Sequence, residues 1–305
     1  MIEIDESMYE PIESTNLGVF SRGWVRFNKG LFQGKTTLIK NVGKYKGSRT
    51  VDFVNVGNYE IPFIALNPLI AESLSKLGDP KGEVAEYYLV KQNGELLICS
   101  PSFIDDTEEL IEGTDILKHE HQRLSRLNPE DVIIMVSDII EQQRKRKVPQ
   151  EVIDENIKQF LKDCFKNAYM EMIDSHNSNF GMLYAGIGRA RTAPIYDLDV
   201  GLNVPFEYIP DIDPLIKNVI SGNKAMMSSD DFLPNYIATI GKKYTWFDSW
   251  VKGFINNLRD IDLGRILLEE KQVEIGPEQI KHYMDFIKSK NAIIDKYFLR
   301  VSGQR

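Results

Sequence analysis

The stretch Ile173-Asp174-Ser175-His176-Asn177-Ser178-Asn179-Phe180-Gly181, followed by Ala193-Pro194-Ile195-Tyr196-Asp197, decides how this sequence is interpreted. It places an amide, Asn179, five residues after Asp174, and a second carboxylate, Asp197, 23 residues after the first. One carboxylate is suited to accept the proton of an acceptor hydroxyl, whereas an amide oxygen and a second carboxylate are suited to hold Mg²⁺ against nucleotide phosphates. Mg²⁺ takes oxygen ligands and keeps several waters, so one or two protein oxygens are enough. The spacing therefore predicts phosphoryl transfer.

The roles of individual residues in this loop follow from its chemistry and spacing. Taken alone, Asp174 would be an ordinary turn residue, because Asp-Ser and Asn-Ser pairs favour turns. Its spacing from Asn179 and Asp197 is the reason to predict Asp174 as the catalytic base and the other two as Mg²⁺ ligands. His176 and Asn177 are assigned to the same catalytic loop. Two alternatives stay open for His176: it orients Asp174, or it only supports the loop.

A cation is also expected near the nucleotide phosphates, and the N-terminal part of the chain supplies a candidate. Lys40 lies in Thr37-Leu38-Ile39-Lys40-Asn41-Val42, an expected strand that would hold its long stem against apolar neighbours, although a strand lysine is usually just solvated. Glu72 is the only acid on the one helix expected in this part, so we predict that it pairs with Lys40. The adenine is expected to contact backbone between Ser100 and Phe103.

The chain has no strongly marked phosphate-binding loop. Neither GxGxxG nor GxxxxGK[ST] occurs, which disfavours a P-loop nucleotide hydrolase. Residues 13–23 are rich in hydroxyl groups and glycine. They are either a cover over the phosphates or a plain surface loop.

Periodicity divides the chain into two parts. Short β-branched and aromatic runs between turns predict strands in residues 1–103, with one helix that starts at Asn67-Pro68 and ends at Gly78. We predict an α+β, bilobal, protein-kinase-like fold: a strand-rich N-lobe (1–103) that binds nucleotide phosphates, and a larger, mainly helical C-lobe (104–305) that carries the catalytic and metal-binding loops. In the C-lobe we expect helices from Asn128 and over 149–172, 213–221, 230–240, 246–258 and 277–299, and strands over 181–184 and 192–195.

Composition narrows the class of partner and compartment. The net charge of −8 argues against nucleic acid or an anionic membrane as a direct partner, because either would favour a basic face. Cys99 and Cys164 lie far apart in apolar patterns and indicate reduced core thiols. The N-terminus shows no signal-peptide pattern, and no apolar run approaches the roughly 20 residues of a membrane span. We expect a cytoplasmic protein, with secretion by a route without a classical signal left open.

The two loops resemble the catalytic and metal-binding loops of HipA-like serine/threonine kinases, most of all the small single-chain members. The family pattern is Asp-x-His-x-x-Asn, then Pro, an aromatic or apolar residue, Tyr or Phe, and Asp. It falls on Asp174, His176, Asn179, Pro194, Tyr196 and Asp197. Leu38-Ile39-Lys40 is similar to the strand lysine of the family, and Leu74-Ser75-Lys76-Leu77-Gly78 to the end of its helix.

This resemblance implies an activity and a set of partners. Such kinases use ATP and Mg²⁺, phosphorylate Ser or Thr of a protein substrate, and often autophosphorylate on a small-lobe loop. Ser14, Thr15 and Ser21 are the candidates for that site. Many relatives are toxins restrained by an antitoxin or similar regulator protein, and some are bacterial effectors.

The sequence also departs from the family pattern. Glu171-Met172 stand where the family often has Gly-Asn, and counting back from Leu77-Gly78 puts the family's helix glutamate on Asn67. Two other activities would use the same scaffold: a small-molecule kinase of the antibiotic or sugar type, and a nucleotide-binding pseudokinase that serves as an interaction module. The intact set of Asp174, Asn179 and Asp197 argues against the pseudokinase, because a pure binder needs no base.

Overall fold

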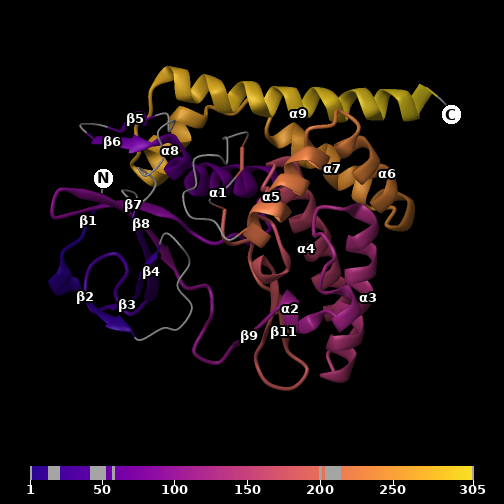
Figure 1. Cartoon of the computed structure of the whole chain (residues 1–305), viewed down its shortest axis with the longest axis horizontal. Helices are drawn as coiled ribbons and strands as arrows, with labels where there is room; N and C mark the ends of the chain where they lie inside the picture. Colours follow the sequence, from indigo (N-terminus) through magenta and orange to yellow (C-terminus); the bar gives the residue numbers. More distant parts are fainter. Residues whose placement is uncertain are drawn as a thin grey trace.

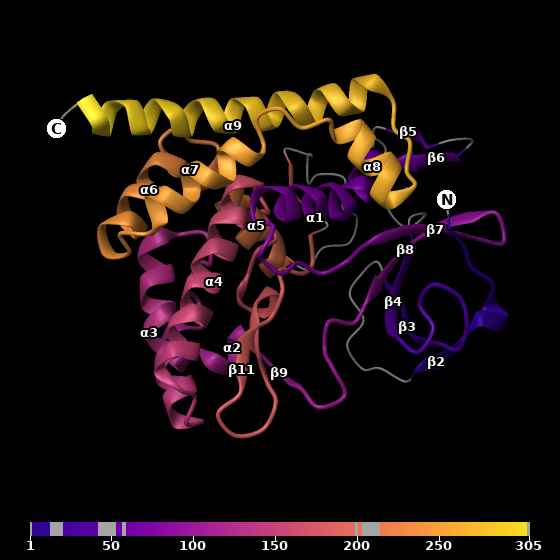
Figure 2. The same ribbon diagram turned by 180° about the vertical axis from the view of Figure 1, so that it is seen from behind.

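The structure is a computed structural model that describes residues 2–12, 21–41, 53–56, 59–198, 201–202 and 214–303. A strand-rich body and a larger helical body lie side by side, and the long helix α9 (Pro277–Gly303) runs along one edge of both (Figure 1). The view from behind shows the same two bodies (Figure 2). In this view helix α1 (Asn67–Gly78) lies between α9 on one side and the two bodies on the other. The predicted combination of a strand-rich part and a larger helical part is confirmed.

A six-stranded sheet forms the body of the small lobe, in the order β1-β7-β8-β4-β3-β2. β1 runs parallel to β7, and the other neighbouring pairs are antiparallel. The turn between β7 and β8 is Asn93-Gly94, with φ of 49° and 82°, which is the left-handed pair that a tight hairpin turn requires. The strands are β1 (Ile2–Glu3), β2 (Tyr9–Ile12), β3 (Ser21–Phe27), β4 (Thr36–Asn41), β7 (Tyr88–Gln92) and β8 (Glu95–Pro101). Short 3₁₀ turns precede β2 (Glu6–Met8) and α1 (Phe63–Leu66), and a separate hairpin joins β5 (Phe53–Val56) to β6 (Tyr59–Pro62).

The sheet is buried on both faces at its centre. Alternate residues of a strand face opposite sides, and in β8 Leu97 and Cys99 enter a small core of the sheet itself, whereas Leu96 and Ile98 enter the main core of the molecule. This explains why β8 is a continuous apolar run instead of an alternating one. The small core consists of Ile4, Val25, Phe27, Phe32, Ile39, Val90, Leu97 and Cys99.

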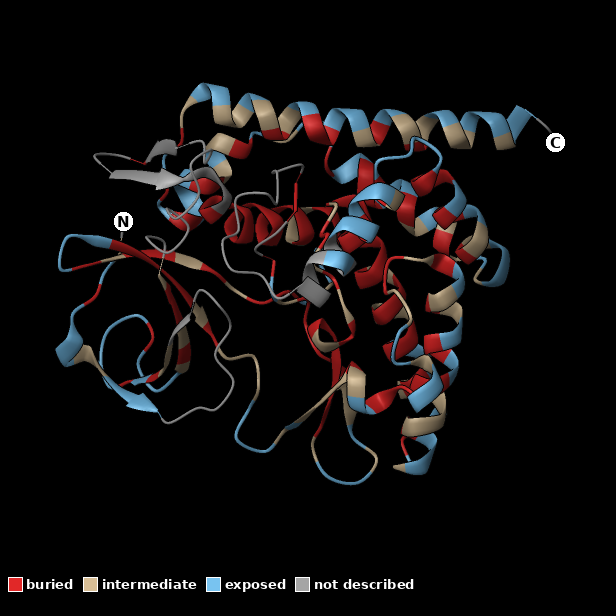
Figure 3. Ribbon diagram, viewed as in Figure 1, coloured by how far each residue is buried: buried red, intermediate tan, exposed pale blue. Residues whose placement is uncertain are grey.

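Helix α1 lies at the centre of the molecule and not on the surface of the small lobe. Pro68 occupies its first turn, as predicted, and the helix is buried around almost its whole circumference, as the red segment in Figure 3 shows. It packs against α7 (Phe247–Asn257) and α8 (Leu263–Lys271), both from the C-terminal part of the chain. The last helices of the chain therefore return to the small lobe.

The large lobe combines a helical bundle with a small sheet. β9 (Glu109–Glu112), β10 (Gly181–Tyr184) and β11 (Ala190–Thr192) form an antiparallel sheet in the order β11-β10-β9. The proposed lobe boundary at residue 103 lies between the end of β8 and the start of β9. The remaining helices are α2 (Gly113–Ile116), α3 (Pro129–Lys145), α4 (Gln150–Tyr169), α5 (Pro214–Met227) and α6 (Phe232–Lys243), with 3₁₀ turns at His119–His121 and Asn177–Asn179.

Most elements expected in the large lobe are found, with four differences. The strand expected over 192–195 is shifted to β11, and Ile195 instead forms an isolated parallel bridge with Val84. Helices α2 and α8 and strand β9 were not expected, because each is at most nine residues long. None of the helices in the described ranges has the length and apolar character needed to cross a membrane.

Candidate active site

The loop with Asp174 starts where α4 ends. Glu171, two residues after the end of that helix, has a left-handed backbone with φ of 53°, which turns the chain back along the helix end. Asn167, in the last turn of α4, donates from Nδ2 to Ser175 Oγ at 3.0 Å, and both side chains are buried. Asp174 is therefore mounted on a loop that the end of α4 holds in place.

The position of Asn179 follows from a single 3₁₀ turn, Asn177–Asn179. Its backbone N–H donates to the His176 carbonyl at 2.9 Å, and its side-chain Nδ2 donates to the Asp174 carbonyl at 2.8 Å. Since the NH₂ group is engaged with the loop, the amide oxygen is the end of this side chain that remains suited to a cation. This arrangement fits the predicted role of Asn179 as a ligand of a hard metal ion.

His176 supports the loop through one ring nitrogen. Its Nδ1 accepts from the Ser178 N–H at 3.2 Å, as the N-cap of the 3₁₀ turn. Its Nε2 lies 4.0 Å from Asp174 Oδ1, which is beyond a direct hydrogen bond. Burial lowers the pKa of His176, although the nearby Asp197 carboxylate acts in the opposite direction. Of the two alternatives for His176, the geometry favours support of the loop by a neutral ring.

Asn177 and Arg126 anchor the loop from inside the protein. Asn177 Nδ2 donates to the Gln122 carbonyl at 2.8 Å. The NH₂ group of this residue, which was predicted to be catalytic, is therefore bound to the protein backbone. Arg126 Nη1 donates to the Asn179 carbonyl at 2.5 Å, and its guanidinium lies 5.3 Å from the centre of the Phe180 ring. The sequence shows no signal for Arg126, because an isolated arginine in a polar loop is normally solvated.

Asp197 is held in an uncommon backbone conformation. Its φ is 58°, which is unfavourable for a residue other than glycine and requires constraint by its surroundings. Its backbone N–H donates to the Tyr87 hydroxyl at 3.0 Å. The preceding residue, Tyr196, donates from its hydroxyl to the Ser178 carbonyl at 2.7 Å, and burial keeps this hydroxyl protonated by raising its pKa. The two loops that the sequence singled out are thus linked directly.

Lys40 and Asp197 come together across the two lobes. Lys40 Nζ lies 3.2 Å from Asp197 Oδ1, and the lysine is only 6% exposed. The strand lysine predicted from the N-terminal part therefore does reach the metal-binding loop predicted from the C-terminal part.

A cavity of about 280 Å³ lies at this contact. Its lining includes the apolar and aromatic Trp24, Leu38 and Phe103, whereas Lys40, Glu112 and Asp197 supply charge. The Phe103 ring also packs on Tyr196, with centroids 5.4 Å apart. Such a cavity, with an apolar region and a charged region, is suited to a ligand that combines a planar base with phosphates.

Arg191 holds the connection between the lobes. It donates to the Phe103 carbonyl at 2.8 Å and makes a two-pronged ion pair with Glu108, at 2.7 and 2.8 Å. A further bond reaches Glu83 Oε2 at 2.6 Å. The hydrogen bond from Arg191 lowers the pKa of Glu108, so this pair stays ionised. The sequence carries no local signal for Arg191, because its partners lie 83 to 108 positions away along the chain.

The predicted pair between Glu72 and Lys40 is not formed. Within the described residues, the partners of Glu72 are Lys271 Nζ at 2.5 Å, Lys76 Nζ at 2.7 Å and the Tyr87 N–H at 2.8 Å. The reason is the position of α1, which turns Glu72 towards α8 and away from β4. The prediction failed because it assumed that the only carboxylate of the helix must serve the strand lysine.

Asn67, the alternative position for the family's helix glutamate, lies close to the end of the metal-binding segment. Its Nδ2 donates to the Gly201 carbonyl at 3.1 Å, and its Oδ1 accepts from the Tyr283 hydroxyl of α9 at 3.2 Å. Of the candidates for autophosphorylation, Ser14 and Thr15 lie outside the described residues, and for Ser21 only the backbone, at the start of β3, is described.

Asn179 and Asp197 carry oxygen donors of the kind that Mg²⁺ takes. In the described ranges, no group of three or more His, Cys, Asp or Glu side chains lies close enough together to hold a metal ion. A site made from Asn179 and Asp197 would instead leave room for water and phosphate oxygens, which is how Mg²⁺ is usually held. Lys40 would meet the phosphates from the small lobe.

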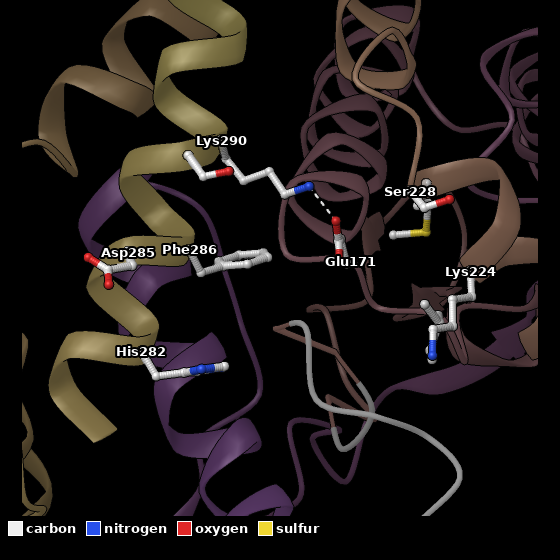
Figure 4. A pocket seen from close by; sticks show the side chains of 10 residues that line it. Glu171, Lys224, Ser228, His282, Asp285, Phe286 and Lys290 are labelled. Atoms are coloured by element: carbon white, nitrogen blue, oxygen red, sulfur yellow. Dashed lines mark hydrogen bonds and ion pairs between the residues drawn. The ribbon is translucent and has the colours of Figure 1, made fainter. Parts of the chain in front are cut away.

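A second cavity, of about 490 Å³, lies between the end of α4, the end of α5 and α9 (Figure 4). An ion pair between Lys290 and Glu171 crosses it, and Lys224 and Asp285 lie on opposite walls. Its lining contains none of the residues predicted for catalysis, nucleotide binding or metal binding. Of the predicted site residues, Lys40, Phe103 and Asp197 line the first cavity.

Comparison with solved structures finds proteins that this chain resembles in fold. The crystal structure of the Helicobacter pylori proinflammatory kinase CtkA matches with a TM-score of 0.54 and 14% sequence identity, over 99% of this chain and 98% of that chain. HipA of Shewanella oneidensis MR-1, from a toxin–antitoxin complex with HipB and operator DNA, matches with a TM-score of 0.43 and 13% identity, over 95% of this chain and 66% of that chain. No family model and no curated protein matches the sequence. The predicted α+β kinase-like fold is confirmed, and the resemblance seen in the loops extends to the fold.

Proposed function

We propose that this protein is an ATP- and Mg²⁺-dependent phosphotransferase that phosphorylates serine or threonine of a protein substrate. The observation that carries the proposal is the contact between Lys40 and Asp197, 3.2 Å apart at the wall of the interlobe cavity. A cation from the small lobe and a carboxylate from the large lobe meet there on a kinase-like fold. Holding a nucleotide between them is the simplest use of that arrangement.

In the proposed reaction the acceptor hydroxyl oxygen attacks the γ-phosphorus, and the bond from that phosphorus to the β–γ bridging oxygen breaks, which releases ADP. Asp174 accepts the hydroxyl proton. Asn179 and Asp197 would hold Mg²⁺, which neutralises charge on the phosphates when bound. Lys40 orients the phosphates, and the backbone near Phe103 receives the adenine.

Support for this division of roles comes from how the loops are held. The Tyr196 hydroxyl ties the metal-binding segment to the catalytic loop at Ser178, and Arg126 anchors the carbonyl of Asn179. Pre-organised ligands that need no rearrangement at the moment of transfer are what phosphoryl-transfer sites require.

The test is transfer of label from γ-labelled ATP with Mg²⁺, to the chain itself and to an added protein rich in serine and threonine. Asp174→Asn and Asp197→Asn are compared with Asp260→Asn, a control on an exposed carboxylate outside the site. We expect labelling by the unmodified chain and the control, and loss in both site variants. Labelling that survives in Asp174→Asn would contradict the proposal, as would failure of the unmodified chain to bind ATP.

A nucleotide-binding pseudokinase is the second candidate. The observation that favours it is Glu72, which binds Lys271 and Lys76 instead of Lys40, whereas active protein kinases pair the strand lysine with a helix glutamate. ATP binding without transfer to any acceptor would support this candidate. Transfer to an aminoglycoside or a sugar, and not to protein, would support the small-molecule kinase. Autophosphorylation, an antitoxin or regulator as partner, a toxin or effector role and a cytoplasmic location stay predictions from the sequence.

A further inference from the structure

The segment before β7 runs alongside the metal-binding segment. Val84 forms a parallel bridge with Ile195, and the Ala85 N–H donates to the Ile195 carbonyl at 2.8 Å. Two residues further along, the Tyr87 hydroxyl accepts the N–H of Asp197 at 3.0 Å. Residues 84–87 therefore contact the backbone that leads to Asp197 and the N–H of Asp197 itself.

Tyr87 is itself held by a buried ion pair. Its backbone N–H donates to Glu72 Oε2 at 2.8 Å, and its carbonyl accepts from Lys271 Nζ at 3.1 Å. Lys271 Nζ also lies 2.5 Å from Glu72 Oε1, which closes the triangle between the three residues. Glu72 is fully buried, Tyr87 is 2% exposed and Lys271 is 5% exposed. A buried pair of this kind is costly to break from one side, so it keeps the Tyr87 backbone in one place.

We propose that Tyr87, together with the Glu72–Lys271 pair, positions Asp197 as a metal ligand and so couples helix α8 to the active site. This inference rests on the proposed function of Asp197. Its physical basis is the backbone of Asp197, whose φ of 58° persists only where the surroundings hold it. The Tyr87 hydroxyl is the group that receives the N–H of this residue, and the pair between α1 and α8 decides where that hydroxyl lies.

The proposal explains why the carboxylate of α1 is buried although it does not reach Lys40. Glu72 contributes through the second layer of the site: it holds Tyr87, and Tyr87 holds Asp197. Groups that orient a metal ligand in this way typically change metal affinity or activity by about 10- to 100-fold when removed. The expected effect is thus on the metal requirement, more than on nucleotide contacts in the apolar part of the cavity.

The first experiment compares Tyr87→Phe with Tyr88→Phe. Both remove one hydroxyl from adjacent residues, but the Tyr88 hydroxyl donates to Glu86 and has no contact with Asp197. We expect Tyr87→Phe to raise the Mg²⁺ concentration for half-maximal labelling by roughly 10-fold, with a smaller change in the KM for ATP. Equal Mg²⁺ dependence in the two variants would overturn the proposal.

The second experiment needs no catalysis. Hydrogen–deuterium exchange is measured on the peptide that contains Asp197, in the full chain, for the same two variants. Tyr87→Phe should accelerate exchange at this peptide and Tyr88→Phe should not; unchanged exchange in Tyr87→Phe overturns the positioning role. If the unmodified chain transfers no label, the proposed function fails while the exchange result still decides this inference.

Variants of Lys271, on α8, distinguish a role in positioning Asp197 from an effect on protein stability alone. Lys271→Met removes the cation from α8, and Lys271→Arg restores one. Loss of Mg²⁺ affinity in the first variant, measured at a temperature at which it is fully folded and recovered in the second variant, supports the coupling. If Lys271→Met lowers the melting temperature but leaves the Mg²⁺ dependence of labelling and the exchange at Asp197 unchanged, α8 is not coupled to the site.

Discussion

Arg126 donates from Nη1 to the backbone carbonyl of Asn179 at 2.5 Å, from a side chain that is 2% exposed. A buried arginine is rare unless it is paired. Desolvation raises the pKa of the buried Asp163, and the positive charges of Lys166 and Arg126 act against that rise. The core of the large lobe is thus connected electrostatically to the loop that carries the candidate metal ligand.

Arg126→Met should both destabilise the protein and impair transfer. Removing the guanidinium takes the hydrogen-bond donor away from the Asn179 carbonyl and a positive charge away from the buried Asp163. We therefore expect the free energy of unfolding to fall by about 3 kcal/mol. Urea denaturation measures this change. Arg123→Met, an exposed arginine on the same loop, is the control and should stay within about 0.5 kcal/mol of the unmodified protein.

Lys40→Met should slow transfer by about 100-fold or more without unfolding the protein. The lysine meets the cavity from β4, and a cation aimed at the transferred phosphates typically contributes about 100-fold or more to the rate. Lys35→Met is the matched control, because Lys35 is exposed at the turn before the same strand. Rates of label transfer, with circular dichroism to confirm folding, check the prediction. Similar rates in the two variants would remove Lys40 from the site.

The lowered pKa of His176 predicts a loss of stability in acid. Since burial depresses this pKa in the folded state, the unfolded chain binds the proton more readily, and stability falls as pH drops below the ordinary histidine value of 6.5. The loss continues down to the lowered pKa of the folded state, where it levels off. His176→Asn keeps an N-cap acceptor for Ser178 and should flatten this part of the profile. Urea unfolding between pH 5 and pH 7.5 tests it; an unchanged slope would contradict the assignment.

Arg191→Lys should weaken nucleotide binding more than it slows transfer. A lysine keeps the charge but loses the two-pronged contact with Glu108 and the simultaneous bond to Phe103, so the connection between the lobes becomes less rigid. We expect the Kd for ATP to rise by roughly 10-fold, because about 1–2 kcal/mol of ordering is then required on binding. Calorimetry with a non-hydrolysable ATP analogue measures this. Arg189→Lys, at the adjacent turn, is the control.

Local patterns were enough to predict several elements correctly. Asn93-Gly94 specifies the β7–β8 turn because both residues tolerate positive φ, and Asn67-Pro68 marks the start of α1 because proline is favoured in a first helical turn. The apolar spacing of α4 and the polar loop after it are likewise properties of contiguous sequence. The kinase-like fold was predicted from these features and from the two loops together.

The sequence by itself determined most of the strands, helices and turns, and which polar residues stand at the spacing of a phosphoryl-transfer site. Those properties depend on neighbours along the chain, so periodicity and turn chemistry are sufficient to predict them. Only the tertiary structure decided that Glu72 binds Lys271 and not Lys40, that Arg126 reaches Asn179, and that Tyr87 receives the N–H of Asp197. Each of these contacts joins residues 53 to 199 positions apart, and its partner is chosen by the packing of buried helices and loops, which no local pattern records.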